Sequence, residues 1–218
     1  MQMTVAALWR YPVKTLAGEP MSTAELTRQG IPGDRVVQVR GPEGIRTSRR
    51  HHRLLGLQAT LGGDGAPLIN GLAWNSPGAL ELVRDAAGAD AWLEAGTGPD
   101  RFDVLPLLVA TDGAVERFGR DVRRLRPNIL IGGVAGMDEV EWPGAELVIG
   151  DAVIDLDSLR QRCPMTIVDP DTLERDRDVL VDIHRRFDGK LALNAGVRTP
   201  GTIHVGDEVF LRRPHRSA

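Results

Sequence analysis

The stretch ELVIGDAVIDL, residues 146–156, decides the fold class because it reads as a strand, a tight turn and a second strand. A Gly-Asp pair between two short β-prone segments favours the two-residue turn of a β-hairpin. The same pattern recurs in TIHVGDEVFL, residues 202–211. The sequence therefore predicts two hairpins in its C-terminal half and a mainly β protein around them.

Other short strands are predicted from β-compatible composition or from alternation with a period of two. They are TVAALW (4–9), STAEL (22–26), VVQVR (36–40), VLPLLVA (104–110) and NILIGG (128–133). A Gly-Pro-Glu-Gly turn at 41–44 links the third of these to IRTS as a further hairpin. The predicted fold class is mainly β, a β-barrel architecture with a few helices.

Three helices are predicted between these strands. ALELVRDAAGADAWL (79–93) is amphipathic, a helix capped at Thr111-Asp112 ends at Gly119, and DVLVDIHRRF (178–187) has one apolar side. The Gly- and Pro-rich stretch GTGPD (96–100) is the predicted linker. We therefore expect two lobes, an N-terminal β-barrel domain over residues 1–95 and a β-rich domain over 96–218.

Composition excludes several classes of protein. Of the 218 residues, 42% are hydrophobic and 26% charged, which suits a globular protein, and the net charge of −3 argues against nucleic-acid binding through bulk electrostatics. A single cysteine cannot form an intramolecular disulfide. The apolar runs are too short for a signal peptide or a membrane span. We expect a cytoplasmic protein with neither a nucleic-acid nor a membrane partner.

The commonest catalytic motifs are missing. The chain has no phosphate-binding P-loop, no well-placed G-x-G-x-x-G, no G-x-S-x-G and no H-E-x-x-H. His51 and His52 are adjacent, so on a strand they would point to opposite faces and not share a metal ion. Zinc at Cys163 lacks a second ligand at a suitable spacing.

Four short segments each hold a cation at a turn. They are YPVKT (11–15), GDR (33–35), LRPN (125–128) and RC (162–163), and the cations are Lys14, Arg35, Arg126 and Arg162. Each alone could be a solvated surface cation, but proline and Gly-Asp turns fix the direction of such side chains. Fixed cations on several loops favour a phosphorylated or polyanionic ligand. The groups that could complete this site are Thr15, Asn128 and the backbone at Thr111, Asp112 and Gly113.

These segments, taken in order, resemble the MOSC-domain family of molybdenum-cofactor proteins, which includes the mitochondrial amidoxime-reducing component and its bacterial relatives. The resemblance rests on YPVKT, IPGDRVVQV, RTSRRHHRLL, PLLVATDGAV, LRPNILIGG, RCPMTIVDPDTLE and PGTIHVGDEVFL, and it covers nearly all of residues 4–213. It implies an N-terminal MOSC-associated barrel followed by a MOSC domain.

The resemblance also implies a mononuclear molybdenum cofactor, with Cys163 as the protein ligand to the metal. A soft thiolate suits such a metal, and Arg162 beside it would favour the thiolate. Asp169 either helps to deliver protons or only turns the chain. The residues that the resemblance assigns to the pterin and its phosphate are Lys14, Thr15, Arg35, Thr111, Asp112, Gly113, Arg126, Asn128 and Arg162.

The implied function is an oxidoreductase that reduces N-hydroxylated compounds, such as amidoximes or hydroxylamines, to amines. One cysteine cannot ligate an iron–sulfur cluster, so the electrons would come from a separate donor protein. A non-catalytic cofactor carrier or sulfur-handling module, and a barrel that binds another phosphorylated ligand, are the alternatives. Pro164 and Ala114 depart from the family pattern, and the region 60–100 is shorter than in the mitochondrial relatives.

Overall fold

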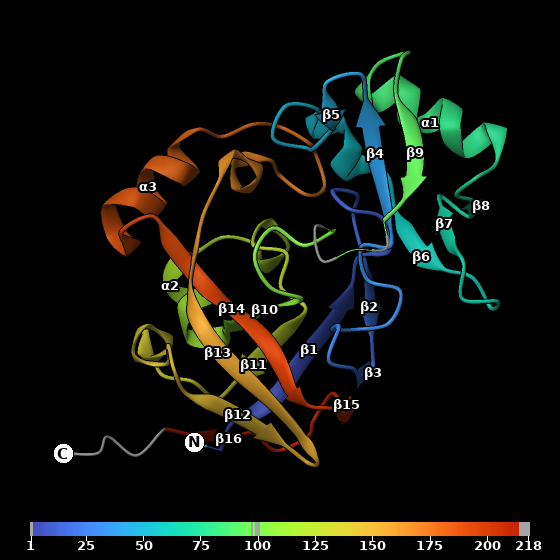
Figure 1. Ribbon diagram of the computed structural model, residues 1–218. Coiled ribbons are helices and arrows are strands. Elements are labelled where there is room, and N and C mark those ends of the chain that lie inside the picture. Colours follow the sequence, from blue (N-terminus) through green and yellow to red (C-terminus); the bar gives the residue numbers. More distant parts are fainter. Residues whose placement is uncertain (1, 97, 99–100, 214–218) are drawn as a thin grey trace.

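The largest sheet of the protein contains strands from both ends of the chain. The computed structural model describes residues 2–96, 98 and 101–213, and Figure 1 shows this sheet below and to the left. Its eight strands pair in the order β16-β12-β13-β14-β10-β11-β1-β2, and only the β10–β11 pair is parallel. The strands are β1 (Thr4–Arg10), β2 (Glu19–Met21), β10 (Leu107–Thr111), β11 (Ile129–Gly132), β12 (Glu146–Ile149), β13 (Ala152–Gln161), β14 (Lys190–Thr199) and β16 (Phe210–Arg212).

The N-terminal strands complete the sheet that the C-terminal half builds. β1 pairs with β11, with Thr4 opposite Gly132 and Leu8 opposite Ile129. A separate pair joins β3 (Thr23–Leu26) to β15 (Gly201–His204). These pairings cross the predicted division between residues 95 and 96. Among the described residues β16 and β2 do not pair with each other, so the hydrogen-bonded sheet is open.

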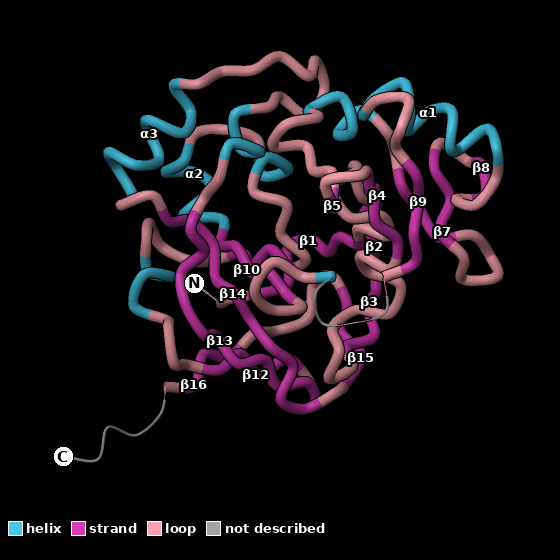
Figure 2. Tube along the Cα trace, turned by 45° about the horizontal axis from the view of Figure 1, so that its top comes forward, coloured by secondary structure: helices cyan, strands magenta, loops and turns pink. Residues whose placement is uncertain are grey.

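A second lobe lies beyond the end of β1, at the upper right of Figure 1 and on the same side in Figure 2. In it β4 (Val37–Gly41) lies between β5 (Gly44–Ile45) and β9 (Trp92–Ala95). The remaining elements are β6 (Ala59–Leu61), β7 (Pro67–Ile69), β8 (Leu72–Ala73), α1 (Pro77–Ala87) and the 3-10 helix η1 (His52–Gly56). This lobe has its own core, which includes Val13, Leu54 and Val83.

Helices α2 (Asp112–Phe118) and α3 (Asp178–Phe187) share a third small core, in which Phe118, Ile183 and Leu191 are buried. Three 3-10 helices complete the larger lobe: η3 (Val122–Arg124), η4 (Asp138–Glu141) and η5 (Pro164–Ile167). No helix among the described residues is long and apolar enough to cross a membrane. The mainly β class with a few helices is confirmed.

Local turn signals predicted several elements correctly. The hairpin in ELVIGDAVIDL is the β12–β13 pair, and VVQVR pairs with IRTS as β4 and β5. The two later helices begin and end where the sequence predicted, with Thr111 capping α2 and Gly119 ending it in the left-handed region. Residues 97, 99 and 100 of the predicted linker GTGPD lie outside the described part of the chain.

Two predictions were wrong. TIHVGDEVFL does not form a hairpin, because β15 pairs with β3 and β16 pairs with β12. Its Gly-Asp turn instead bonds to β1, through Val5 N to Asp207 O and Gly206 N to Val5 O. The helix predicted over 79–93 ends at Ala87, because Gly88 adopts φ +112° and residues 92–95 continue as β9.

Candidate functional site

A pocket formed by both halves of the chain collects most of the predicted site residues. We call it the cation pocket. Its walls contain six cations (Lys14, Arg35, Arg49, Arg126, Arg160 and Arg162) and one carboxylate, Asp103. The predicted residues that line it are Lys14, Thr15, Arg35, Arg126, Asn128, Arg162 and Cys163. An excess of fixed positive charge in a partly enclosed space favours an anionic ligand.

Strained backbone positions fix three of these side chains. Thr15, Arg35 and Arg126 have φ values of +81°, +55° and +58°, in the left-handed region that non-glycine residues rarely adopt. Such positions cluster at functional sites, where the surrounding structure holds them. Here Arg35 N donates to Tyr11 O at 2.7 Å, and Tyr11 N donates to the buried Asp34 carboxylate at 2.7 Å. These bonds tie the YPVKT and GDR segments together.

Tyr11 lies between two of the cations. The guanidinium carbons of Arg126 and Arg35 are 4.2 and 5.1 Å from its ring centroid, and its hydroxyl donates to Pro127 O at 2.9 Å. Burial raises the pKa of Tyr11 to about 12 and lowers that of Arg126 to about 10. Arg126 forms no ion pair with any described residue. It is therefore a buried cation without a protein counter-ion.

Asn128 is fully buried and connects three segments at the floor of the pocket. Its side-chain oxygen accepts from Leu108 N at 3.2 Å and from Arg35 at 3.4 Å, and its amide donates to Trp9 O at 3.3 Å. The amide group thereby aligns β1, β10 and the GDR turn around the cations.

Cys163 lies in the pocket wall between the end of β13 and the start of η5. Its neighbour Arg162 donates to Leu125 O at 2.8 Å and to Leu191 O at 3.5 Å, while the buried Nε of Arg162 has no partner. Burial lowers the pKa of Arg162 to about 10. Burial also acts to lower the pKa of Arg49, but interactions with the neighbouring Cys163 and Asp103 outweigh it and raise that pKa. Pro164 occupies the first position of η5, where a missing N–H needs no partner.

Asp103 joins three of the cations at the pocket wall. Its carboxylate is 2.9 Å from Lys14, 2.9 Å from Arg160 and 3.1 Å from Arg49. Burial acts to raise the pKa of Asp103, but these cations hold it below its usual value. Six polar residues of the pocket wall were not predicted as site residues: Thr47, Arg49, Asp103, Arg160, Gln161 and Asn194. The sequence signals for them are the RTSRR stretch, which contains Thr47 and Arg49, and the basic residues before Cys163, which include Arg160.

Three predicted site residues do not line the pocket. Thr111 caps α2 by accepting from Ala114 N at 3.3 Å. Asp112 accepts from Gly133 N at 2.7 Å and from Val134 N at 3.0 Å. A Cβ on Gly113 would lie 2.4 Å from Val134 O. The polar groups of this segment serve the packing of α2, and the structure keeps them apart from the cations.

Asp169 also lies outside the pocket wall. One carboxylate oxygen accepts from Asp171 N and Thr172 N, both at 3.0 Å, and the other accepts from Arg124 at 2.8 Å. The backbone N–H groups, with Thr172 first, lower the pKa of Asp169. All of these contacts stabilise the turn in VDPDT.

The buried carboxylate of Glu139 supports the pocket from behind. Glu139 is fully buried and accepts from the backbone N–H and the hydroxyl of Thr111 at 3.1 and 2.7 Å, and from Ala192 N at 2.9 Å. Ala192 has φ +66°, and the preceding residue, Leu191, supplies a carbonyl to Arg162. Glu139 therefore holds Ala192 in its strained conformation, next to the Leu191 carbonyl that accepts from Arg162. Burial raises the pKa of Glu139.

Glu139→Gln is expected to lower the free energy of unfolding by about 2 kcal/mol, because an amide cannot accept from both Thr111 and Ala192 and leaves a buried N–H unpaired. Urea denaturation measures this. The matched control is Glu141→Gln, an exposed residue of the same 3-10 helix, which should change the value by less than about 0.5 kcal/mol. Equal stability of the two variants would contradict the role of Glu139.

Comparisons with known proteins match both halves of the chain. The model of the MOSC N-terminal beta barrel domain matches residues 2–104, and that of the MOSC domain matches residues 111–210. The chain is 29% identical to the human protein "Mitochondrial amidoxime-reducing component 1", with 95% of this chain and 82% of that protein covered. It is 26% identical to "Mitochondrial amidoxime reducing component 2" of Macaca fascicularis, with coverage of 95% and 83%.

A solved structure shares the fold. The YuaD protein from Bacillus subtilis superposes with a TM-score of 0.52 at 13% identity, over 99% of this chain and 98% of that one. The two family matches together cover the second lobe and most of the sheet and of the cation pocket. The chain belongs to the MOSC-domain family and combines a MOSC N-terminal beta barrel domain with a MOSC domain.

Proposed function

We propose that the protein binds a molybdenum cofactor in the cation pocket and reduces N-hydroxylated compounds to amines. One observation carries this proposal: the only thiol of the chain, Cys163, lies in the wall of a pocket that holds six cations and one carboxylate. A thiolate is a ligand for a soft metal, and the cations suit a phosphorylated organic group.

The residues of the pocket fit this cofactor. Arg126 is a buried cation without an ion-pair partner in the described chain, and the buried Nε of Arg162 lacks an acceptor. Both groups gain a partner if an anion with several oxygen atoms binds between them. Lys14, Arg49 and Arg160 already converge on a carboxylate, Asp103, which shows that they can be held around one anionic group.

When bound, the cofactor would supply two-electron redox chemistry, and the protein orients it and tunes its electrostatics. In the overall reaction the N–O bond of the substrate breaks. Two electrons and two protons are consumed, the oxygen leaves as water, and an amidoxime becomes an amidine. Cys163 would hold the metal, while Lys14, Thr15, Arg35, Arg126, Asn128 and Arg162 would bind the pterin and its phosphate. Arg49, which lies beside Cys163, would place a further cation next to the metal ligand.

The electrons would come from a separate donor protein, since one cysteine cannot ligate an iron–sulfur cluster. The relatives named as amidoxime-reducing components support the N-hydroxylated substrate class. Within this proposal Asp169 holds the loop that follows Cys163, because it accepts from two backbone N–H groups of that turn and ties the turn to Arg124.

The test is the reduction of benzamidoxime by protein purified from a host that produces the cofactor, with a chemically reduced dye as electron donor. Molybdenum bound near one per chain together with benzamidine formation would support the proposal. Tight cofactor binding without turnover of any N-hydroxylated compound would favour a carrier or sulfur-handling module. A protein that carries no molybdenum would contradict both.

A further inference from the structure

One carboxylate, Asp103, lies among the positive charges of the cation pocket. It pairs with Lys14, Arg49 and Arg160, which come from the loop after β1, the loop before η1 and the end of β13. A phosphate group accepts hydrogen bonds from the same donors as a carboxylate. An anionic ligand that uses these three cations must therefore compete with Asp103 for them.

Asp103 belongs to a segment that leads into β10 and that we call the strap, residues 101–106. Among the described residues, no backbone hydrogen bond is donated or accepted by residues 102–105. Val104, next to Asp103, is 54% exposed. Segments with exposed residues and few backbone hydrogen bonds open at a lower free energy than a paired sheet does.

Both ends of the strap are anchored to the turn at residues 27–30. Arg101 donates to Gln29 O at 3.0 Å, and a Cβ on Gly30 would lie 2.8 Å from Pro106 Cβ. Between these ends, the ion pairs of Asp103 are the polar contacts that hold the strap against the pocket in the described part of the chain. The middle of the strap can therefore move outwards while its ends stay in place.

The open space of the cation pocket is about 80 Å³. Pockets for organic ligands typically measure roughly 300–1,000 Å³, so a wall of this pocket has to move before a phosphorylated organic group can bind. Phe102, Asp103 and Leu105 of the strap line this space. Outward movement of the strap would enlarge the pocket and release three cations at once.

We propose that Asp103 takes the place of the anionic group of the ligand, and that the strap closes the pocket until a phosphate displaces this carboxylate. The inference rests on the proposed function, because it assigns a device for ligand entry to the same pocket. Burial acts to raise the pKa of Asp103, but Lys14, Arg160 and Arg49 lower it and keep the carboxylate ionised. A phosphate carries more negative charge and more acceptor oxygens than a carboxylate, so it has the advantage in this competition.

Titration calorimetry with inorganic phosphate tests the inference on the full chain, made in a host that lacks the cofactor. Asp103→Asn keeps the shape of the side chain and removes its charge. Phosphate should bind this variant at least about tenfold more tightly than wild type, because no closed state has to be opened first. A carboxylate that only positions the cations for the ligand would give weaker binding instead.

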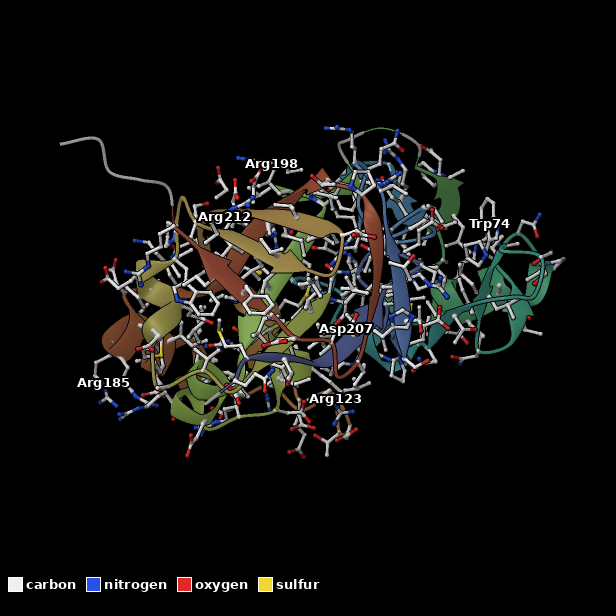
Figure 3. The ribbon with its side chains drawn as sticks, turned by 90° about the horizontal axis from the view of Figure 1, so that it is seen from below. Trp74, Arg123, Arg185, Arg198, Asp207 and Arg212 are labelled. Atoms are coloured by element: carbon white, nitrogen blue, oxygen red, sulfur yellow. The ribbon has the colours of Figure 1, made fainter. Side chains whose placement is uncertain are left out.

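The matched control is Asp182→Asn, which removes one charge from another carboxylate that joins two arginines. Asp182 pairs with Arg185 and Arg186 on α3, and Figure 3 shows Arg185 at the edge of the molecule. This variant should bind phosphate within about twofold of wild type, because its ion pairs lie at the surface and outside the pocket.

Cleavage by trypsin after Arg101 gives a second readout, which reports on the strap itself. Phosphate should accelerate this cleavage in wild type by at least about fivefold, because the protease needs the residues after Arg101 to be accessible. Cleavage after Arg212, an exposed residue at the end of β16, should not be accelerated. In Asp103→Asn, cleavage after Arg101 should be fast without phosphate. A ligand that only stabilises the fold would slow cleavage at both sites.

The inference would be overturned by phosphate binding to Asp103→Asn that is equal to or weaker than binding to wild type, or by a lack of phosphate binding in both proteins. Slower cleavage after Arg101 in the presence of phosphate would also overturn it, and this wild-type measurement decides if the variant does not fold. Protein from a cofactor-producing host that carries no molybdenum would instead contradict the proposed function. The phosphate measurements would still decide whether the strap opens.

Discussion

Cys163→Ser is expected to lower the molybdenum retained per chain, and benzamidoxime reduction with it, by at least about 100-fold. Even the residues that only orient metal ligands change affinity by about 10- to 100-fold when replaced, and Cys163 is the proposed ligand itself. A serine hydroxyl is a poor ligand for a soft metal and is not ionised at neutral pH. Elemental analysis of purified protein, normalised to chain concentration, measures the effect.

The control for this variant is Val181→Ser, which introduces the same hydroxyl at a 63% exposed position of α3. It should retain molybdenum and activity at wild-type levels. Both variants should unfold at urea concentrations close to that of the cofactor-free wild type, because Cys163 is only half-buried and anchors no core. Full molybdenum occupancy in Cys163→Ser would contradict the assignment of the ligand.

Arg126→Met is expected to have opposite effects on stability and on cofactor binding. Burial lowers the pKa of Arg126 to about 10, so below that pH the folded protein carries a charge that costs about 3 kcal/mol. This cost in stability is fully present at neutral pH. It is lost only above the ordinary pKa of arginine, where Arg126 is deprotonated in both the folded and the unfolded chain. Loss of the contact with Tyr11 offsets about 2 kcal/mol of the gain. The cofactor-free variant should therefore be more stable by about 1 kcal/mol.

The same substitution removes a cation that would face the phosphate or pterin, so cofactor retention should fall by at least about tenfold. Urea denaturation of the cofactor-free protein and molybdenum analysis of the loaded protein give the two values. Arg185→Met, on the exposed surface of α3, is the control and should change neither. A variant that is both less stable and fully loaded would contradict the account of Arg126.

The elements that the sequence predicted correctly are those specified by neighbouring residues. The β12–β13 hairpin needs only its own turn, and α2 needs only the cap at Thr111 and the glycine at 119. The strand pairs around β15 and β16 could not be predicted in this way. Their partners, β3 and β12, lie far away in the sequence, and bonds to β1 determine the geometry of the Gly206-Asp207 turn.

The residues of the candidate site show the same difference between those marked by neighbouring residues and those determined by distant contacts. Lys14, Arg35 and Arg126 could be selected because proline and Gly-Asp turns next to them fix their direction. Asp103 could not, because its partner Arg160 is 57 residues away and nothing in the neighbouring sequence marks Asp103. Thr111 to Gly113 have the sequence of an anion-binding helix start, but contacts with Glu139 and Val134 use their polar groups.

The most direct test of the central claim is the position of the metal. Crystals of the protein from a cofactor-producing host, measured at the molybdenum absorption edge, would locate the metal by anomalous scattering. Our account predicts a single molybdenum peak per chain in the cation pocket beside the sulfur of Cys163. A peak elsewhere in the molecule, or a fully loaded protein whose molybdenum does not contact Cys163, would contradict it.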